Sequence, residues 1–401
     1  MDIIEPSGYR DFVWAVEIHR LGLEIMGLWP KNDKSDTNNL WPKLRVGIIL
    51  ILLISVTNVP MIHAVMQVWG NMVMVVNNLR IALPMLISSM KYVIMLWKQR
   101  VLLSIINMMA EDWTAFKSNT ERDVMIKQAQ TARFIMIIGY VVAITASLTV
   151  IIPCFFGIQV ISQTNLTDQH KLLPLAAYRF YDTNKSPQYE LTFCIHAIAI
   201  LVSTTIYMSV DIFLVLMALH ICGQLENFRC RLFNLISRKN FNKILNNIVA
   251  SHLRMIRFTD NIENTYSLMM LIMVLHFVIV FCLTGFLFTV FLIEKEMNKV
   301  IMSNIYLSIM MLIALLMNTF MYCGAGELIT EQCNAVYREI YNLEWYKLES
   351  KNGRNLILLM IRTRHPFCIT AGKIIPLTMA TFCSVLKTSS GYISFLMAKR
   401  S

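Results

Sequence analysis

Residues 266–293 read YSLMMLIMVLHFVIVFCLTGFLFTVFLI, and this stretch contains no Asp, Glu, Lys or Arg. A helix that crosses the apolar core of a bilayer needs about 20 consecutive, mostly apolar residues. Inside lipid a backbone satisfies its polar groups internally, which a single helix does along its whole length. The stretch therefore predicts a membrane-spanning helix and decides the class of the fold.

Six further apolar stretches of similar length occur along the chain. Hydrophobic residues make up 56% of the 401 residues and charged residues 15%, whereas soluble domains carry about 25% charged residues. We predict an all-α membrane protein with seven transmembrane helices, forming a single domain over residues 1–401. The other six predicted spans are 46–66, 74–97, 134–158, 191–219, 300–325 and 374–398.

Lys and Arg are distributed unevenly between the two sides of the predicted bundle. The amino-terminal segment and the connections after the second, fourth and sixth spans hold 26 of these residues, and the opposite side holds 7. Because cytoplasmic loops carry the excess of Lys and Arg, we predict a cytoplasmic amino terminus and an extracellular carboxyl terminus. We expect contact with membrane lipid in the plasma membrane. Positive charge in such connections does not predict binding of nucleic acid.

The three long connections on the predicted cytoplasmic side are 98–133, 220–264 and 327–369. Their apolar residues recur at helical spacing, and no Gly-, Pro- or Ser-rich linker sets them apart. We expect the spanning helices to continue into the cytosol and to pack there as a helical anchor. A separate soluble domain is the alternative.

The loop after the third span, which we predict to be outside, contains two candidate modification sites. Asn165-Leu166-Thr167 is a glycosylation acceptor pattern. Cys154 and Cys194 fall near the two edges of this loop and are candidates for a disulfide, the alternative being that both simply pack as small apolar residues. The nine cysteines include no CxxC pair, so we expect neither a metal site nor a cofactor.

The chain lacks the motifs of common enzyme classes and of G-protein-coupled receptors. GxGxxG, GxxxxGK[ST], HExxH and GxSxG are absent, so we predict that it is not an enzyme. A G-protein-coupled receptor has an external amino terminus, which is the opposite of the orientation predicted here. A membrane transporter stays an alternative, although paired helices broken by Gly or Pro in two repeated halves are not evident.

The carboxyl-terminal part carries a specific resemblance. It reads Thr370-Ala371-Gly372-Lys373, then Pro376-Leu377, then TFCSVLKTSSGY over residues 381–392. This pattern resembles the last helix of insect odorant receptors. Gustatory receptors usually end with T-Y, five residues and Q-F, and only Tyr392 fits that pattern; a gustatory-type receptor channel for a contact chemical is the alternative. The obligate odorant co-receptor has a long insertion in its second cytoplasmic loop, which 220–264 lacks.

The resemblance implies a ligand-specific subunit of an odorant-gated, non-selective cation channel. Its partner would be the co-receptor subunit in a tetramer, and its ligand a small volatile or cuticular organic molecule. The seventh helices would surround one pore. Polar residues 387–390 fit a helix that faces protein or water instead of lipid alone.

Four residues of the last span are candidates for the pore and gate: Lys387, Tyr392, Phe395 and Lys399. The last three are spaced three and four apart and share one helix face. By alignment with the family, Phe395 stands at a hydrophobic gate, and packing against a neighbouring helix is the alternative. Lys399 lies one turn further out, where a cation would oppose cation flow and lower the conductance.

The family's odorant site lies in the outer half of the bundle, between the second, third, fourth and sixth spans. The candidates there are Leu79, Leu83, Ile87, Ser147, Ile151, His196, Ile200, Tyr306 and Met310. Ordinary packing is the alternative for each aliphatic residue, and for His196 the alternative is a satisfied interior histidine. We expect Arg80 to reach the outer surface or to pair with an acid of the outer loops, and Asp211 to have a structural partner.

Overall fold

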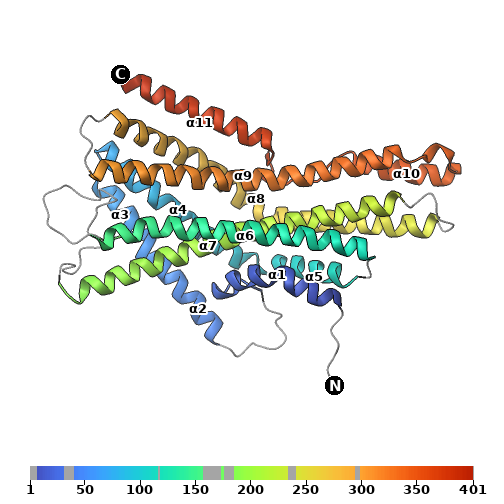
Figure 1. Cartoon of the computed structure of the whole chain (residues 1–401), viewed down its shortest axis with the longest axis horizontal. Coiled ribbons are helices and arrows are strands. Elements are labelled where there is room, and N and C mark those ends of the chain that lie inside the picture. Colours follow the sequence, from blue (N-terminus) through green and yellow to red (C-terminus); the bar gives the residue numbers. More distant parts are fainter. Residues whose placement is uncertain are drawn as a thin grey trace.

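The computed structural model describes residues 7–30, 40–115, 118–156, 173–175, 185–233, 241–293 and 299–400. The described part is a bundle of helices that run along one long axis (Figure 1). Six helical segments are long and apolar enough to cross a membrane, which confirms the first six predicted spans: Leu40–Gln67, Met72–Trp97, Asn119–Phe155, Gln188–Phe233, Phe241–Phe291 and Met302–Lys347. The chain is therefore a multi-pass, all-α membrane protein.

The first span is one helical rod with a local change of winding. It consists of α2 (Leu40–Ile51), a π-helical segment (Leu52–Asn58) and α3 (Val59–Gln67). Pro60 lies just after the π segment and cannot donate a backbone hydrogen bond. Wider winding before a proline relieves its clash with the preceding turn. α1 (Ser7–Ile25) precedes this span.

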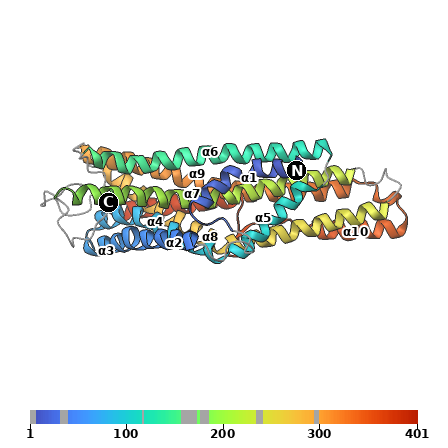
Figure 2. The same cartoon turned by 90° about the horizontal axis from the view of Figure 1, so that it is seen from below.

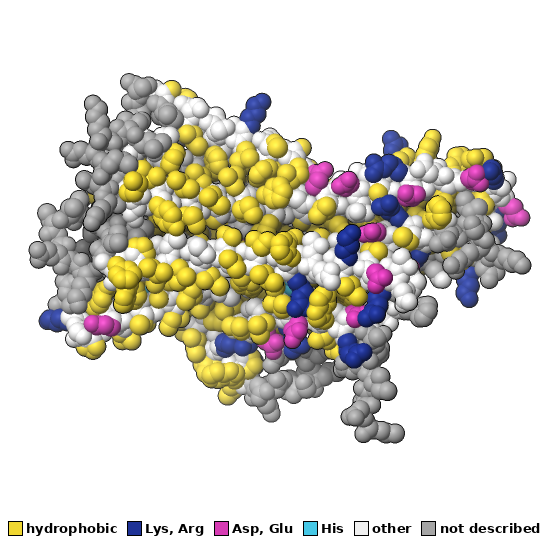
Figure 3. Space-filling model, viewed as in Figure 1, with side chains coloured by type: hydrophobic (Ala, Val, Ile, Leu, Met, Phe, Trp, Pro, Cys, Tyr) yellow, Lys and Arg dark blue, Asp and Glu magenta, His cyan; other side chains and the backbone are white. Residues whose placement is uncertain are grey.

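Three helices continue well beyond their apolar segments. They are α7 (Gln188–Phe233), α8 (Phe241–Ile293) and α9 (Lys299–Asn342). Together with α5 (Gln99–Thr114), the start of α6 (Asn119–Phe155), a short 3-10 turn (Trp345–Lys347) and α10 (Ser350–Thr363), they form one end of the bundle, which we call the α10 end (Figure 2). Figure 3 shows that charged side chains gather towards this end, whereas hydrophobic side chains predominate in the middle of the face shown.

Ion pairs join the helices at the α10 end. Arg231 on α7 lies 2.7 Å from Glu121 on α6. Asp112 on α5 accepts from Arg254 on α8 at 2.7 Å and lies 3.1 Å from His220 on α7. Burial opposes the ionisation of Asp112, but His220 and Arg254 outweigh it and hold the pKa of this carboxyl below its usual value.

A short β-hairpin, and not a helix, opens the seventh predicted span. β1 (Thr370–Ala371) pairs in antiparallel fashion with β2 (Ile375–Pro376), and Gly372 and Lys373 turn the chain with φ of 65° and 61°. The Gly372 and Lys373 N–H groups donate to the backbone oxygen and the hydroxyl of Ser267 on α8, at 2.8 and 2.9 Å. The T-A-G-K motif is thus a turn fastened to α8. The predicted helix start at Ile374 is wrong because this turn and Pro376 precede the helix.

The last helix, α11 (Met379–Arg400), lies at the periphery beside α8 and α9 (Figure 1). Its first backbone N–H, from Met379, donates to Glu327 of α9 at 3.0 Å. A carboxylate is favourable there because the N-terminus of a helix carries partial positive charge. At Gly285 of α8 an added Cβ would lie 2.3 Å from the Ile393 side chain, so the two helices pack closely.

A buried ion pair joins α4 (Met72–Trp97) to α7 in the middle of the bundle. Lys91 Nζ lies 2.6 and 2.7 Å from the two carboxylate oxygens of Asp211, and both side chains are buried. The ammonium also donates to the Tyr322 hydroxyl of α9 at 3.3 Å and lies 3.5 Å from the ring centre of Tyr207. The prediction of a structural partner for Asp211 is confirmed.

We expect Asp211→Asn to destabilise the bundle by about 3–5 kcal/mol, because it leaves the Lys91 ammonium buried without a counter-ion. The double variant Lys91→Met, Asp211→Leu should recover most of this loss. Thermal denaturation of detergent-solubilised protein, followed by size-exclusion fluorescence, measures both effects.

The matched control is Asp11→Ala, which breaks the more exposed pair with Arg122 and should cost less than about 1 kcal/mol. Equal losses in Asp11→Ala and Asp211→Asn would contradict the central role of the buried pair.

Candidate functional site

A cavity of about 410 Å³ lies between α4, α6, α7 and α9. Its wall is almost entirely apolar and includes seven methionine and leucine side chains from α9: Leu307, Met310, Met311, Leu315, Met317, Met321 and Leu328. Cavities of about 300–1,000 Å³ with mainly apolar walls and a few polar groups are typical sites for small organic ligands. This cavity is the candidate functional site.

Small residues on α6 and α9 leave the space for the cavity. α6 presents Gly139, Ala143 and Ala146 to the cavity, and α9 presents Ala314 and Gly324. At Gly324 an added Cβ would meet no atom within 4 Å. Small side chains on two facing helices leave unfilled volume because their neighbours cannot close the gap completely.

A residue of the connection between α6 and α7 lines the end of the cavity that lies away from α10, here called the far end. Leu175 is fully buried and packs in one cluster with Ile81 of α4, Ile200 of α7 and Leu307 of α9. All four side chains line the cavity.

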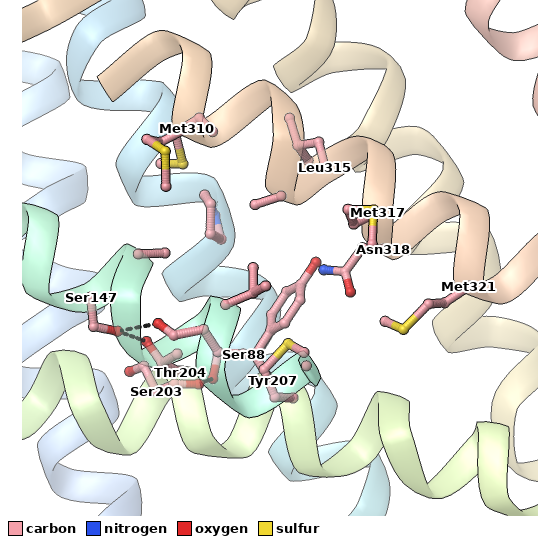
Figure 4. A pocket seen from close by; sticks show the side chains of 18 of the residues that line it. Ser88, Ser147, Ser203, Thr204, Tyr207, Met310, Leu315, Met317, Asn318 and Met321 are labelled. Atoms are coloured by element: carbon pink, nitrogen blue, oxygen red, sulfur yellow. Dashed lines mark hydrogen bonds between the residues drawn. The ribbon is translucent and has the colours of Figure 1, made fainter. Parts of the chain in front are cut away.

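A strip of hydroxyl groups crosses one wall (Figure 4). The Ser147 and Thr204 hydroxyls lie 2.9 Å apart, which links α6 to α7. The Ser88 hydroxyl donates to the Ser203 backbone oxygen at 2.7 Å. The buried Ser203 hydroxyl has no partner among the described residues. A ligand oxygen or amide in the cavity could therefore complete its hydrogen bonding at little cost.

Tyr207 occupies the middle of the cavity. Its ring reaches from α7 towards the Asn318 side chain of α9 (Figure 4), and its face lies against the Lys91 ammonium. A cation on the face of an aromatic ring is attracted to the ring quadrupole. The ion pair that holds α4 to α7 therefore also fixes the position of this cavity residue.

The cavity reaches α9 close to the contact that holds α11. Gly324, Ala325 and Leu328 line it, and the two residues between Ala325 and Leu328 touch the hairpin and α11. An added Cβ at Gly326 would lie 2.1 Å from the Leu377 oxygen, and Glu327 accepts from the Met379 N–H. One turn of α9 thus faces the cavity on one side and the start of α11 on another.

Three of the nine predicted ligand residues line this cavity: Ser147, Ile200 and Met310. The other six lie outside its lining. Tyr306 is exposed, His196 and Ile87 are buried, and Leu79, Leu83 and Ile151 are half-buried. His196 is buried outside this cavity, and its Nδ1 has no hydrogen-bond partner among the described residues, so it is not the satisfied interior histidine of the alternative and its role stays a prediction.

The sequence expectation for Arg80 is wrong, and of the two alternatives for Cys154 and Cys194 the structure has free thiols. Arg80 neither reaches the surface nor pairs with a described acid: it is fully buried and donates to Ser308 at 2.7 Å and Asn304 at 3.1 Å. Cys154 is buried and Cys194 is exposed, and both thiols are free, so the two side chains face different surroundings and form no disulfide. Asn165 lies outside the described residues.

The predicted pore residues lie on α11. Lys387, Tyr392 and Phe395 are exposed, on the face that turns away from α8 and α9. Ser389, in contrast, is buried against α8, where its carbonyl accepts from the Cys282 thiol at 3.7 Å. Lys399 belongs to the last turn of α11, but its side chain lies outside the described residues.

Sequence reasoning missed Ser203, Thr204, Tyr207, His276 and Asn318, all of which line the cavity. A usable signal was present, because each is a polar residue inside an otherwise apolar span. Such residues usually face the protein interior. Our candidates were instead selected mainly by their depth in the membrane, which does not say which way a side chain points.

The sequence is similar to that of known proteins. Residues 71–390 match the family model described as 7tm Odorant receptor. Odorant receptor 10 of Aedes albopictus is 25% identical over 222 residues, which is 54% of this chain and 57% of that protein. Odorant receptor 67a of Drosophila melanogaster is 22% identical over 145 residues, 36% of this chain and 34% of that protein. The matched segments thus span about half of these relatives or less.

The fold also matches a solved structure over nearly its full length. The olfactory receptor OR5 of the insect Machilis hrabei, in complex with eugenol, has a TM-score of 0.79. The match covers 97% of this chain and 99% of that one at 18% identity. A structure of the same receptor described without eugenol gives a TM-score of 0.78.

We expect Ala314→Phe to fill the cavity and abolish the stabilisation that a small apolar ligand gives. A ligand at 100 times its Kd stabilises by about 2.7 kcal/mol. The thermal shift of purified protein in a panel of six- to ten-carbon alcohols and ketones measures this effect. Ile313→Phe, at the neighbouring exposed position, is the control and should keep the shift. A shift retained in Ala314→Phe would show that the ligand binds elsewhere.

Proposed function

We propose a function from the premise that this chain belongs to the 7tm odorant receptor family, whose model matches residues 71–390. The family makes it a receptor and not an enzyme, as predicted, and favours an odorant receptor over a gustatory-type channel or a transporter. In our proposal the chain is the ligand-specific subunit of a ligand-gated, non-selective cation channel. It detects small apolar volatile or cuticular chemicals in the cavity between α4, α6, α7 and α9.

The cavity is the observation that carries this proposal. An apolar wall suits ligands that gain from leaving water, since each buried methylene is worth about 0.8 kcal/mol. The few polar groups, chiefly Ser203, Tyr207 and Asn318, would orient a ligand that has a single oxygen or nitrogen. Such a site discriminates by shape and by one hydrogen bond.

The charge distribution supports a cytoplasmic amino terminus and a plasma-membrane location. Charged side chains gather towards the α10 end (Figure 3), where the long helical extensions pack. Placing this end in the cytosol follows the excess of Lys and Arg and makes the extensions the cytoplasmic anchor proposed for 98–133, 220–264 and 327–369. The far end of the cavity is then in the outer half of the membrane.

The exposed face of α11 supports a pore at the centre of a tetramer. Lys387, Thr388, Tyr392 and Phe395 are exposed on the single chain. A Lys that faced lipid at this depth would cost a few kcal/mol, so this face is better suited to water or to a partner subunit. We propose that α11 lines the pore beside a co-receptor subunit, with Phe395 as the hydrophobic gate.

The shared turn of α9 provides a connection between cavity and pore. Gly324, Ala325 and Leu328 would contact the ligand, while Gly326 and Glu327 hold the start of α11. A change in how α9 packs around a ligand would therefore move the base of the proposed pore helix directly. Packed contacts of this kind transmit small shifts because neither side can yield.

Co-expression with an odorant co-receptor in oocytes tests the function. We expect members of an odorant panel to evoke an inward, non-selective cation current that Ala314→Phe abolishes and Ile313→Phe retains. Surface labelling of the same cells checks that both variants reach the membrane. Transport of a panel compound without current would instead identify a transporter.

Single-channel recording tests the two outermost pore residues. Phe395→Ala should raise the current without odorant, because a smaller side chain no longer keeps the gate dry. Lys399→Ala should raise the unitary conductance, because it removes a cation from the external mouth of a cation pore. Ser394→Ala is the control for the same turn of α11.

Unchanged basal current in Phe395→Ala would place the gate elsewhere. Unchanged conductance and selectivity in Lys399→Ala would remove Lys399 from the ion path.

A further inference from the structure

The first six apolar spans contain very few charged side chains, and their charges do not cancel. In residues 46–66, 73–96, 134–155, 191–219, 266–293 and 302–325 the Lys, Arg, Asp and Glu residues are Arg80, Lys91 and Asp211. Lys91 and Asp211 form an ion pair at 2.6 Å, so at a distance they act as a dipole. Arg80 is left as a net positive charge inside the bundle.

The surroundings of Arg80 are polar but neutral. Its two terminal nitrogens donate to Ser308 and Asn304, and its Nε has no partner among the described residues. No carboxylate of the described residues lies within ion-pair distance of it. Asn77, one turn before Arg80 on the same face of α4, and Asn78 are also buried with unpaired amide atoms. The site solvates the guanidinium without neutralising it.

The Arg80 guanidinium binds α9 at Ser308, next in the chain to the cavity residue Leu307. Ile81, the neighbour of Arg80, lines the far end, as does Leu307. Ile81 and Leu307 pack in one cluster with Leu175 and Ile200. With these neighbours in the wall, about one layer of apolar side chains would separate a ligand at this end from the guanidinium. Such a layer contains no ions or water to screen the charge.

We propose that Arg80 makes the far end of the cavity electropositive and thereby sets ligand class. The receptor takes neutral ligands with a carbonyl or ester oxygen that points towards the α4–α9 junction, and it rejects cationic amines. Arg80 acts here as a specificity-determining residue that does not touch the ligand. This inference rests on the proposed function only in taking the cavity as the ligand site.

The sizes of the electrostatic and desolvation energies determine whether neutral or ionised ligands are favoured. Across one side-chain layer, the attraction between a full charge and a carbonyl dipole is worth roughly three- to tenfold in affinity. Repulsion of a full positive charge is worth roughly tenfold or more. A carboxylate would be attracted more strongly, but removing it from water without a direct partner outweighs that gain. Neutral carbonyl compounds are therefore favoured over both ionic classes.

Three probes with the same seven-carbon chain separate these effects: heptan-2-one, its hydrocarbon analogue 2-methylhept-1-ene, and heptan-2-amine, which is protonated at pH 7. Their Kd values are measured with purified full-length protein by thermal shift. The gain from replacing C=CH2 by C=O is the ratio of the hydrocarbon Kd to the ketone Kd. We expect this ratio to be about three- to tenfold larger in the wild type than in Arg80→Met.

Asn304 offers a test that keeps the arginine. Asn304→Asp has nearly the same shape and places a carboxylate at the atom that now lies 3.1 Å from the guanidinium. It should remove the ketone preference and improve heptan-2-amine by about tenfold. Asn304→Leu disrupts the same hydrogen bond without adding charge, and it should leave both unchanged. This pair decides the question even if Arg80→Met does not fold.

The proposal is overturned if the ratio of ketone to hydrocarbon Kd is the same in the wild type and Asn304→Asp. It is overturned equally if the wild type binds the amine as tightly as the ketone, or does not bind the ketone. These measurements need no current, so a chain that binds as expected but conducts nothing would contradict the channel function and leave the charge preference standing.

Discussion

The Lys91–Asp211 ion pair is the interaction on which the central part of the bundle depends. It joins α4 to α7, and through the Tyr322 hydroxyl it includes α9. In a bundle surrounded by lipid, apolar contacts between helices gain little over contacts with lipid tails, so a buried polar contact specifies which helix faces meet. The pair also fixes Tyr207 in the middle of the cavity. Stability of the helix packing and shape of the site thus have a common origin.

The first six spanning helices could be predicted from the sequence, because an apolar stretch of about 20 residues has few alternatives. The rotation of each helix could not. In α7 the residues from Met208 to Gly223 are buried without interruption, so hydrophobic periodicity gives no phase that distinguishes a cavity wall from ordinary packing. The candidate ligand residues were selected by depth in the membrane without this phase, and three of the nine line the cavity.

Two further failures have the same physical character. The partners of Arg80 are 224 and 228 positions away in the chain. They are neutral Asn and Ser residues, so no pattern of opposite charge predicts that they bind a cation. The predicted last span, 374–398, includes the second hairpin strand Ile375–Pro376, because a strand of only two residues leaves no period-2 pattern to recognise. The T-A-G-K motif itself was informative about the family, although not about its own conformation.

Gly324 and Gly326 lie two residues apart on α9 and tolerate change very differently. The first borders open space in the cavity, whereas the second touches the backbone at Leu377 so closely that no side chain fits. Substitutions at Gly324 can therefore accumulate in proteins with this fold, whereas Gly326 must stay glycine. Ligand preference can therefore change during evolution while the contact between α9 and the start of α11 is kept.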